Sequence, residues 1–405
     1  MRLTAPLTLA LTIAVLGCNN NPAMTDASTN GDMGSSGSCQ GGPGSVQFTA
    51  SGEVLALGGY AFPPPMNAAG VFVDGWEVHF NKFFAVFDKV TLSTNPDTSP
   101  TDQSQTGPVV AEIDGPWAID LHQGGPLPGK GGGNEQAYPI QAICNQNKNG
   151  NAPFDPTVRY AFSFESVPAT PAATLIKIDP NDPDWQAMLA NHWNVLYVGT
   201  ATWKGDQLPM GMMCTSTNPA YDFSKLPKVV NFKLGFATPT QYINCQNPDN
   251  DPAMGLNGED HQRGVQIKSN AQTIAQVTFH TDHPFWESFT HDTPAHFDQL
   301  AALAQKQTDG TYLVTLDMTK GVNYTAFKDA AGNPLPWRAC APGYTPPNMN
   351  QQMGFDSLSI PYNPNGEPSK VMRDYQDYMR YDQSTQGHLN SDGLCFVQRM
   401  YPSPQ

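Results

Sequence analysis

Four of the chain's nine histidines lie within the short segment 280–296, together with two aspartates and a glutamate. Imidazole nitrogens and carboxylate oxygens are the donors with which proteins bind Zn²⁺ and Cu²⁺. Their close spacing lets the end of one strand and the start of the next helix converge on one ion. The segment therefore predicts a zinc or copper site, and the candidate ligands are His280, Asp282, His283, His291 and His296.

The same segment also has a purely structural interpretation. Histidines beside Pro284, Phe285 and Trp286 are typical of packed loops with satisfied hydrogen bonds, and a carboxylate such as Asp292 organises a helix N-terminus. The dipole of a helix that starts here also opposes a cation at that end. No HExxH signature occurs in the chain, so metal binding and polar packing are both open interpretations.

Thioethers form a second candidate donor set. Three methionines stand directly before Cys214 and two more occur in a later stretch rich in Pro and Asn: Met210, Met212, Met213, Met349 and Met353. Thioethers favour Cu(I), so these residues favour copper as the metal. Their alternative role is to fill irregular gaps under loops.

Two acidic stretches form a third set of candidate donors. Oxygen-rich loops hold Ca²⁺, but neither stretch has the spacing of glycine and bidentate glutamate that an EF-hand requires. Most such residues are turn formers. The residues concerned are Asp179, Asp182, Asp184, Asp249, Asp251, Glu259, Asp260 and the neighbouring His261.

Sequence patterns of other catalytic classes are missing. No GxSxG motif occurs, and the glycine-rich stretch 129–133 lacks the Lys-Ser/Thr ending of a phosphate loop. A metal-dependent hydrolase, with Glu287 or Asp292 as base for a metal-bound water, is an alternative to simple binding. Such a site takes ligands from distant strands, for which the chain offers His79, His261 and His388. Binding without catalysis is the favoured interpretation, and no catalytic residue is assigned.

The elements that position these residues are predicted to be mostly strands. Only 14% of the residues are charged, and 36 glycines and 37 prolines indicate many turns. The strongest strand signal runs from 71 to 92 and changes phase near Asn81, as a β-bulge would. Further strands are predicted at 109–113, 159–164, 174–178, 195–203, 229–236, 264–268, 273–279 and 311–316. The predicted fold class is mostly β, with an antiparallel sandwich or barrel-like body.

Three short helices are predicted within this body. They begin at Asp182, at Thr293 and near Pro368, where capping residues or prolines precede apolar residues at helical spacing. The second helix places His296 in its first turn, close to the strand that ends at His280. The candidate ligands therefore flank one strand and the helix that follows it.

Charge and cysteine content restrict the compartment and the partners. The chain has 21 Lys and Arg against 36 Asp and Glu, and this net charge of −15 disfavours nucleic acid and favours cations. Besides Cys18, six cysteines predict disulfides in an oxidising compartment: Cys39, Cys144, Cys214, Cys245, Cys340 and Cys395. The simplest local closures join Cys214 to Cys245 and Cys340 to Cys395, although the sequence leaves the pairing open.

The first seventeen residues have the pattern of a secretory signal. Arg2 precedes an apolar run at 7–16 that is too short to span a membrane. The residues at its end, Val15, Leu16, Gly17 and Cys18, resemble the lipobox of bacterial lipoproteins. This resemblance implies cleavage before Cys18 and a lipid on that cysteine, which holds the chain on a membrane of the cell envelope. Asn19 resembles the outer-membrane sorting class if the cell is Gram-negative.

The domain organisation follows from these features. Residues 1–17 are the signal peptide, and residues 18–45 are the lipidated cysteine and a flexible tether rich in Asn, Ser and Gly. Residues 46–405 form the β-rich globular region, either as one large domain or as two closely packed β subdomains.

Three functions fit this sequence. The favoured one is an envelope-anchored lipoprotein that binds Zn or Cu through residues 280–296 without catalysis. The second is a surface interaction module with structural histidines, whose protein or glycan partner is unknown. The third is the metal-dependent hydrolase.

Overall fold

The computed structural model describes residues 41–65, 71–208, 213–216, 221–250, 255–289, 294–326, 328–341 and 360–405. By its contacts the chain divides into two units, Met1–Ser38 and Cys39–Gln405. The first unit, with the predicted signal, Cys18 and most of the tether, lies outside the described residues. The second is a single compact unit, and it carries all the elements below.

The longest strand, β2 (Trp76–Ser93), organises a twelve-stranded sheet. Its backbone pairs with four other strands, and its register shifts between Phe80 and Lys82, which confirms the bulge predicted near Asn81. The other strands of this sheet are β3 (Val109–Ile113), β4 (Trp117–Asp120), β7 (Arg159–Ser166), β8 (Thr174–Ile176), β9 (Val195–Trp203), β11 (Val229–Phe236), β12 (Thr240–Ile243), β13 (Val265–Gln266), β15 (Gln305–Lys306), β16 (Tyr312–Thr315) and β19 (Phe396–Arg399).

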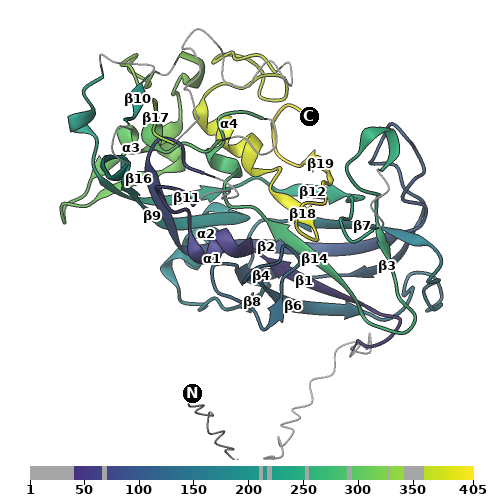
Figure 1. Ribbon diagram of the computed structural model, residues 1–405. Helices are drawn as coiled ribbons and strands as arrows, with labels where there is room; N and C mark the ends of the chain where they lie inside the picture. Colours follow the sequence, from purple (N-terminus) through teal and green to yellow (C-terminus); the bar gives the residue numbers. More distant parts are fainter. Residues whose placement is uncertain are drawn as a thin grey trace, which may run out of the picture. The chain divides into compact units, whose positions relative to one another are not determined.

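A second sheet has five strands in the order β18-β14-β1-β6-β5. Figure 1 shows the green β14 beside the purple β1 and the yellow β18. The bounds of these strands are Gly387–Leu389 for β18, Thr273–Phe279 for β14, Val46–Ser51 for β1, Gln136–Ile143 for β6 and Leu127–Pro128 for β5.

Aromatic rings from the two sheets meet in a shared core. Phe87 of β2 lies 4.8 Å from Phe279 of β14 between ring centroids, and Phe48 of β1 lies 6.5 Å from Phe162 of β7. The four side chains are fully buried. Such contacts are expected where sheets pack face to face and each contributes alternate residues.

The predicted fold class, mostly β with a few short helices and disulfides, is confirmed. Most strand pairs are antiparallel, but β1–β14, β4–β8 and β11–β16 are parallel. These parallel pairs join segments far apart in the chain, and local alternation of residues carries no signal for such pairing.

The short helices agree with the sequence analysis in part. Helix α2 (Pro183–Asn191) begins as predicted, because the side chain of Asp182 accepts a hydrogen bond from the backbone of Asp184. Helix α3 (Asp298–Leu303) begins after Phe297, so the prediction that His296 lies in its first turn is wrong. Helix α4 (Tyr375–Gln383) begins after Asp374 rather than near Pro368, because the Asp374 carboxylate caps it. A further helix, α1 (Glu53–Gly58), follows β1.

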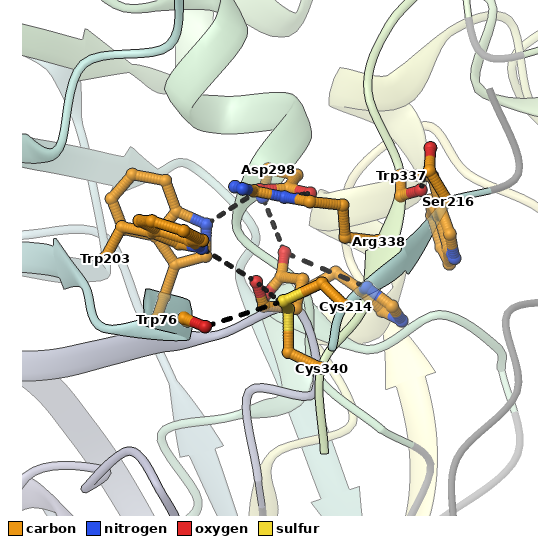
Figure 2. Close-up of a disulfide and its surroundings, with 11 residues drawn as sticks. Trp76, Trp203, Cys214, Ser216, Asp298, Trp337, Arg338 and Cys340 are labelled. Carbon is orange, nitrogen blue, oxygen red and sulfur yellow. Dashed lines mark hydrogen bonds and ion pairs between the residues drawn. A yellow bond between two sulfur atoms is a disulfide. The ribbon is translucent and has the colours of Figure 1, made fainter. Parts of the chain in front are cut away.

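Two disulfides link segments that are distant in sequence. They join Cys214 to Cys340 (Figure 2) and Cys245 to Cys395, so neither of the simplest local closures forms. The reason is strand pairing. In the small two-stranded sheet, Thr215 of β10 (Thr215–Ser216) is opposite Ala339 of β17 (Arg338–Ala339), which brings Cys214 next to Cys340.

The second disulfide follows the same rule. Ile243 of β12 is opposite Phe396 of β19, which places Cys245 beside Cys395. Cys144 is also disulfide-bonded. Among the described residues no helix is long and apolar enough to cross a membrane.

Candidate metal centre

The pairing of β14 with β18 brings two histidines from distant parts of the chain together. In this antiparallel pair Thr278 is opposite His388. His280 follows the strand, and its backbone N–H donates to the carbonyl oxygen of Gln386 at 3.1 Å. His280 is therefore the diagonal neighbour of His388 on the same face, and the two ring centroids are 4.1 Å apart.

A single turn after His280 brings a third histidine ring next to the first two. The 3₁₀ turn η4 (His283–Phe285) places His283 with its centroid 5.5 Å from each of the other two histidine rings. The ring stacks on Trp286 at 3.7 Å between centroids. Its Nδ1 atom shares a hydrogen bond of 2.7 Å with Oγ1 of Thr385, a contact that fixes the orientation of the imidazole.

The three histidines form a compact set of nitrogen donors. One ring nitrogen from each lies within 4.8 Å of the others. Nitrogens around one tetrahedral ion lie about 3.3 Å apart, because Zn–N bonds are about 2.0–2.1 Å long. The rings must therefore draw together slightly to bind an ion. His283, His388 and His280 are 0%, 1% and 8% exposed, so an ion held here is almost wholly withdrawn from water.

A second donor group shares one of these histidines. Donor atoms of Glu53, His280 and Asp392 also lie within 4.8 Å of one another. Nε2 of His280 is 3.3 Å from a carboxylate oxygen of Glu53 and 3.2 Å from the carbonyl oxygen of Ser391. Asp392 is exposed in the loop between β18 and β19. His280 thus stands at the junction of a buried nitrogen set and an outer oxygen set.

Burial and neighbouring charge shift the pKa values of this second group. Burial raises the pKa of Glu53 to about 7, although His280 opposes the rise. Burial alone lowers the pKa of His280, but the carboxylates of Glu53, Asp282 and Asp392 and the hydrogen bond to Ser391 together raise the pKa above its usual value. Because a protonated ligand cannot bind an ion, metal uptake is expected to strengthen as pH rises.

The other predicted ligands have different surroundings. Nε2 of His296 is 2.9 Å from a carboxylate oxygen of Glu287, and its ring lies 3.9 Å from that of Trp337 between centroids. Asp282 contributes negative charge near His280. Among the described residues neither His296 nor Asp282 belongs to either donor group. His291 lies outside the described residues, so its role as a ligand stays a prediction.

The methionine set adds nothing to this centre in the part of the chain that the structure describes. The side chain of Met213 is 85% exposed beside the oxidised Cys214. Met210, Met212, Met349 and Met353 lie outside the described residues.

The acidic stretches are neutralised by the chain's own cations. Lys82 contacts carboxylate oxygens of Asp182 and Asp184 at 2.7 and 2.6 Å. Glu259 pairs with Arg263, and Asp249 with Lys130. Outside the undescribed Asp251 and its neighbours, these stretches supply no group of three converging donors. The alternative of Ca²⁺ at these loops gains no donor group among the described residues, where Lys and Arg side chains pair with Asp182, Asp184, Asp249 and Glu259.

Three residues of the two donor groups lie far in sequence from the segment 280–296 and were not among the predicted metal ligands. His388 was named only as a distant candidate for a hydrolase, and Glu53 and Asp392 were not named. The strand that positions His388 is three residues long, too short for residue alternation to reveal it. The signal that would have found it is the pairing of β18 with β14, which local patterns do not encode.

No protein-family model, no curated protein and no solved structure matches this chain. Its function is therefore inferred from the geometry and chemistry of its own residues.

Proposed function

We propose that this protein is a cell-envelope lipoprotein that binds one transition-metal ion, Zn²⁺ or Cu²⁺, through His280, His283 and His388, and does not catalyse a reaction. The observation that carries the proposal is the buried set of three ring nitrogens within 4.8 Å of one another. Imidazole suits both metals. The net charge of −15 makes the approach of a cation favourable.

The chemistry of the three side chains favours an ion over simple polar packing. Three imidazole rings that converge on one buried point offer three nitrogen donors of the kind that Zn²⁺ and Cu²⁺ bind. The hydrogen bond between Nδ1 of His283 and Oγ1 of Thr385 is the kind of contact that orients a metal ligand from outside the coordination sphere.

The test is a direct measurement of bound metal. The lipid-free unit, Cys39–Gln405, is dialysed against Zn²⁺ and Cu²⁺, and bound metal is quantified by mass spectrometry. We expect close to one ion per chain, and loss of that ion in the double variant His280→Gln/His388→Gln. A matched control, His79→Gln/His192→Gln, alters two exposed histidines and retains the ion.

The opposite results have clear meanings. Metal-free wild-type protein, with circular dichroism showing that it is folded, supports polar packing and the surface interaction module. Equal loss of metal in the control variant points to non-specific binding by surface histidines.

One observation supports the hydrolase alternative. Three histidine ligands with one open position are also the donor set of catalytic zinc centres, and the carboxylate of Glu53 lies beside His280. Turnover of an ester or phosphoester that a chelator abolishes and Zn²⁺ restores would replace the binding proposal with this one.

The anchoring part of the proposal rests on the lipobox-like residues that end in Cys18. Incorporation of a labelled fatty acid that disappears in a Cys18→Ala variant is the expected result. Unchanged labelling would remove Cys18 as the anchor and leave the metal-binding proposal intact.

A further inference from the structure

The donor residues around His280 form a gradient of exposure. Asp392 is exposed and the side chain of Glu53 is 17% exposed. His280 is 8% exposed, whereas His388 and His283 are 1% and 0% exposed. Asp392 thus faces solvent, the side chain of Glu53 is mostly buried beside it, and the nitrogens lie progressively deeper.

A hydrated cation cannot reach the buried set in one step without a large loss of hydration energy. Removing an ion from water is costly unless other ligands replace the water molecules. Carboxylate oxygens replace water readily because they are charged oxygen donors. Donors that meet the ion at the surface therefore lower the cost of dehydration before the nitrogens bind.

His280 belongs to both donor groups. Because His280 is a member of both groups, an ion held by Glu53, Asp392 and His280 can pass to the inner group as His388 and His283 displace the two carboxylates. Only ligands are exchanged in this step. The ion loses its remaining bound water as the carboxylates release it, and the oxidation state of the metal is unchanged.

The backbone around the outer group is held in uncommon conformations. Glu53, Asn390 and Ser391 have φ values of +62°, +52° and +79°. A left-handed φ is unfavourable for residues other than glycine, and such residues cluster where function requires a particular position. Glu53 is one of these residues, and the other two directly precede Asp392 in the chain.

We infer that Glu53 and Asp392, together with His280, form an outer capture site that takes a hydrated divalent cation from solvent and passes it to His388 and His283. This inference rests on the metal binding proposed above. Because Glu53 and Asp392 hold the ion only in transit, they accelerate loading and release alike.

The experiment measures both rates with Cu²⁺ as the probe in the full chain. Cu²⁺ quenches nearby indole fluorescence, and Trp286 stacks on His283, so stopped-flow fluorescence follows loading. A chelator in excess follows release. The test variant is Glu53→Gln/Asp392→Asn. Its control, Asp114→Asn/Glu367→Gln, makes the same amide substitutions at two exposed acids that belong to neither donor group.

We expect loading and release to slow together by about tenfold or more in the test variant, the lower end of what local charge contributes to association rates. The dissociation constant then changes by less than either rate, the stoichiometry stays at one ion, and the control keeps wild-type rates.

Two results overturn the inference while leaving the metal centre in place. If the test variant loads and releases Cu²⁺ at the same rates as the control, Glu53 and Asp392 have no role in capture. Faster release and weaker binding, comparable to the effect of His280→Gln/His388→Gln, make Glu53 a permanent ligand. If the wild-type chain binds no Cu²⁺ or Zn²⁺, the proposed function itself fails, and the capture site with it.

Discussion

At the scale of single residues, the core holds a buried group of charges around Asp74. This side chain is fully buried, and one of its carboxylate oxygens accepts backbone N–H groups of Phe297 and Asp298 at 2.6 and 2.7 Å. The neighbouring Asp298 is bound by two nitrogens of Arg338 at 2.9 and 2.6 Å and by the indole of Trp76 at 2.9 Å, as Figure 2 shows in part. Burial, and next the charge of Asp298, raise the pKa of Asp74 to about 7.

This shift predicts a pH dependence of stability. The folded pKa of Asp74 is raised, so the folded chain keeps a proton that the unfolded chain releases near pH 4. The contribution of Asp74 to stability is therefore present at low pH and is lost as the pH rises from about 4 to about 7. The variant Asp74→Asn lacks this loss. Its free energy of unfolding therefore rises relative to that of the wild type as the pH increases, by at most about 4 kcal/mol.

Urea unfolding of both proteins between pH 4 and pH 8 measures this difference. A difference in free energy of unfolding that stays constant from pH 4 to pH 8 would show that Asp74 stays ionised in the folded chain. The variant Asp309→Asn, which alters an exposed loop carboxylate, serves as the control for general effects of charge removal.

At the scale of secondary structure elements, local signals predicted the strands well where residue alternation was strong. Strands β3, β9, β11 and β14 have the bounds predicted for them. Strands β4, β6 and β12 were not predicted, because tertiary neighbours rather than alternation define them. The start of α3 was also displaced, since apolar spacing locates a helix better than it locates its first residue.

Helix α2 offers a test of how one capping residue acts. Asp182 accepts the backbone N–H of Asp184 at 2.8 Å and also binds Lys82. We expect Asp182→Ala to lower the free energy of unfolding by about 1–2 kcal/mol, because both the cap and the ion pair are lost.

Asp182→Ser separates the two effects, because serine caps a helix but carries no charge. Chemical denaturation should place this variant closer to wild type than to Asp182→Ala. If the serine variant is as unstable as the alanine variant, the ion pair with Lys82 outweighs the cap.

At the scale of the whole molecule, the candidate centre depends on the sheet as much as on the local histidine cluster. The sequence correctly singled out the segment around His280 and His283 as rich in donors. It could not place His388 beside them, because β14 and β18 pair across more than a hundred residues of chain. The outer carboxylates come from two further elements, α1 and the loop after β18.

The disulfides are expected to stabilise this long-range arrangement. Cys245 and Cys395 are separated by 150 residues, and a cross-link over so long a loop restricts the unfolded chain strongly. We expect Cys245→Ser/Cys395→Ser to lower the free energy of unfolding by about 4 kcal/mol. Denaturant unfolding measures the loss, and a loss below about 1 kcal/mol would mean that pairing of β12 with β19 holds this end of the chain unaided.

The order of these cysteines along the chain also bears on how the protein is made. The bonds interleave, because Cys245 lies inside the loop closed by Cys214 and Cys340, whereas Cys395 lies beyond it. Cysteines emerge in the order of the chain, so a dithiol oxidant that accepted two electrons from each successive pair of thiols would join Cys214 to Cys245 and Cys340 to Cys395, and neither bond is native. The native disulfides therefore form either after the last residues have emerged or through a catalyst that isomerises non-native disulfides. Cells without a disulfide isomerase should accordingly accumulate mispaired chains.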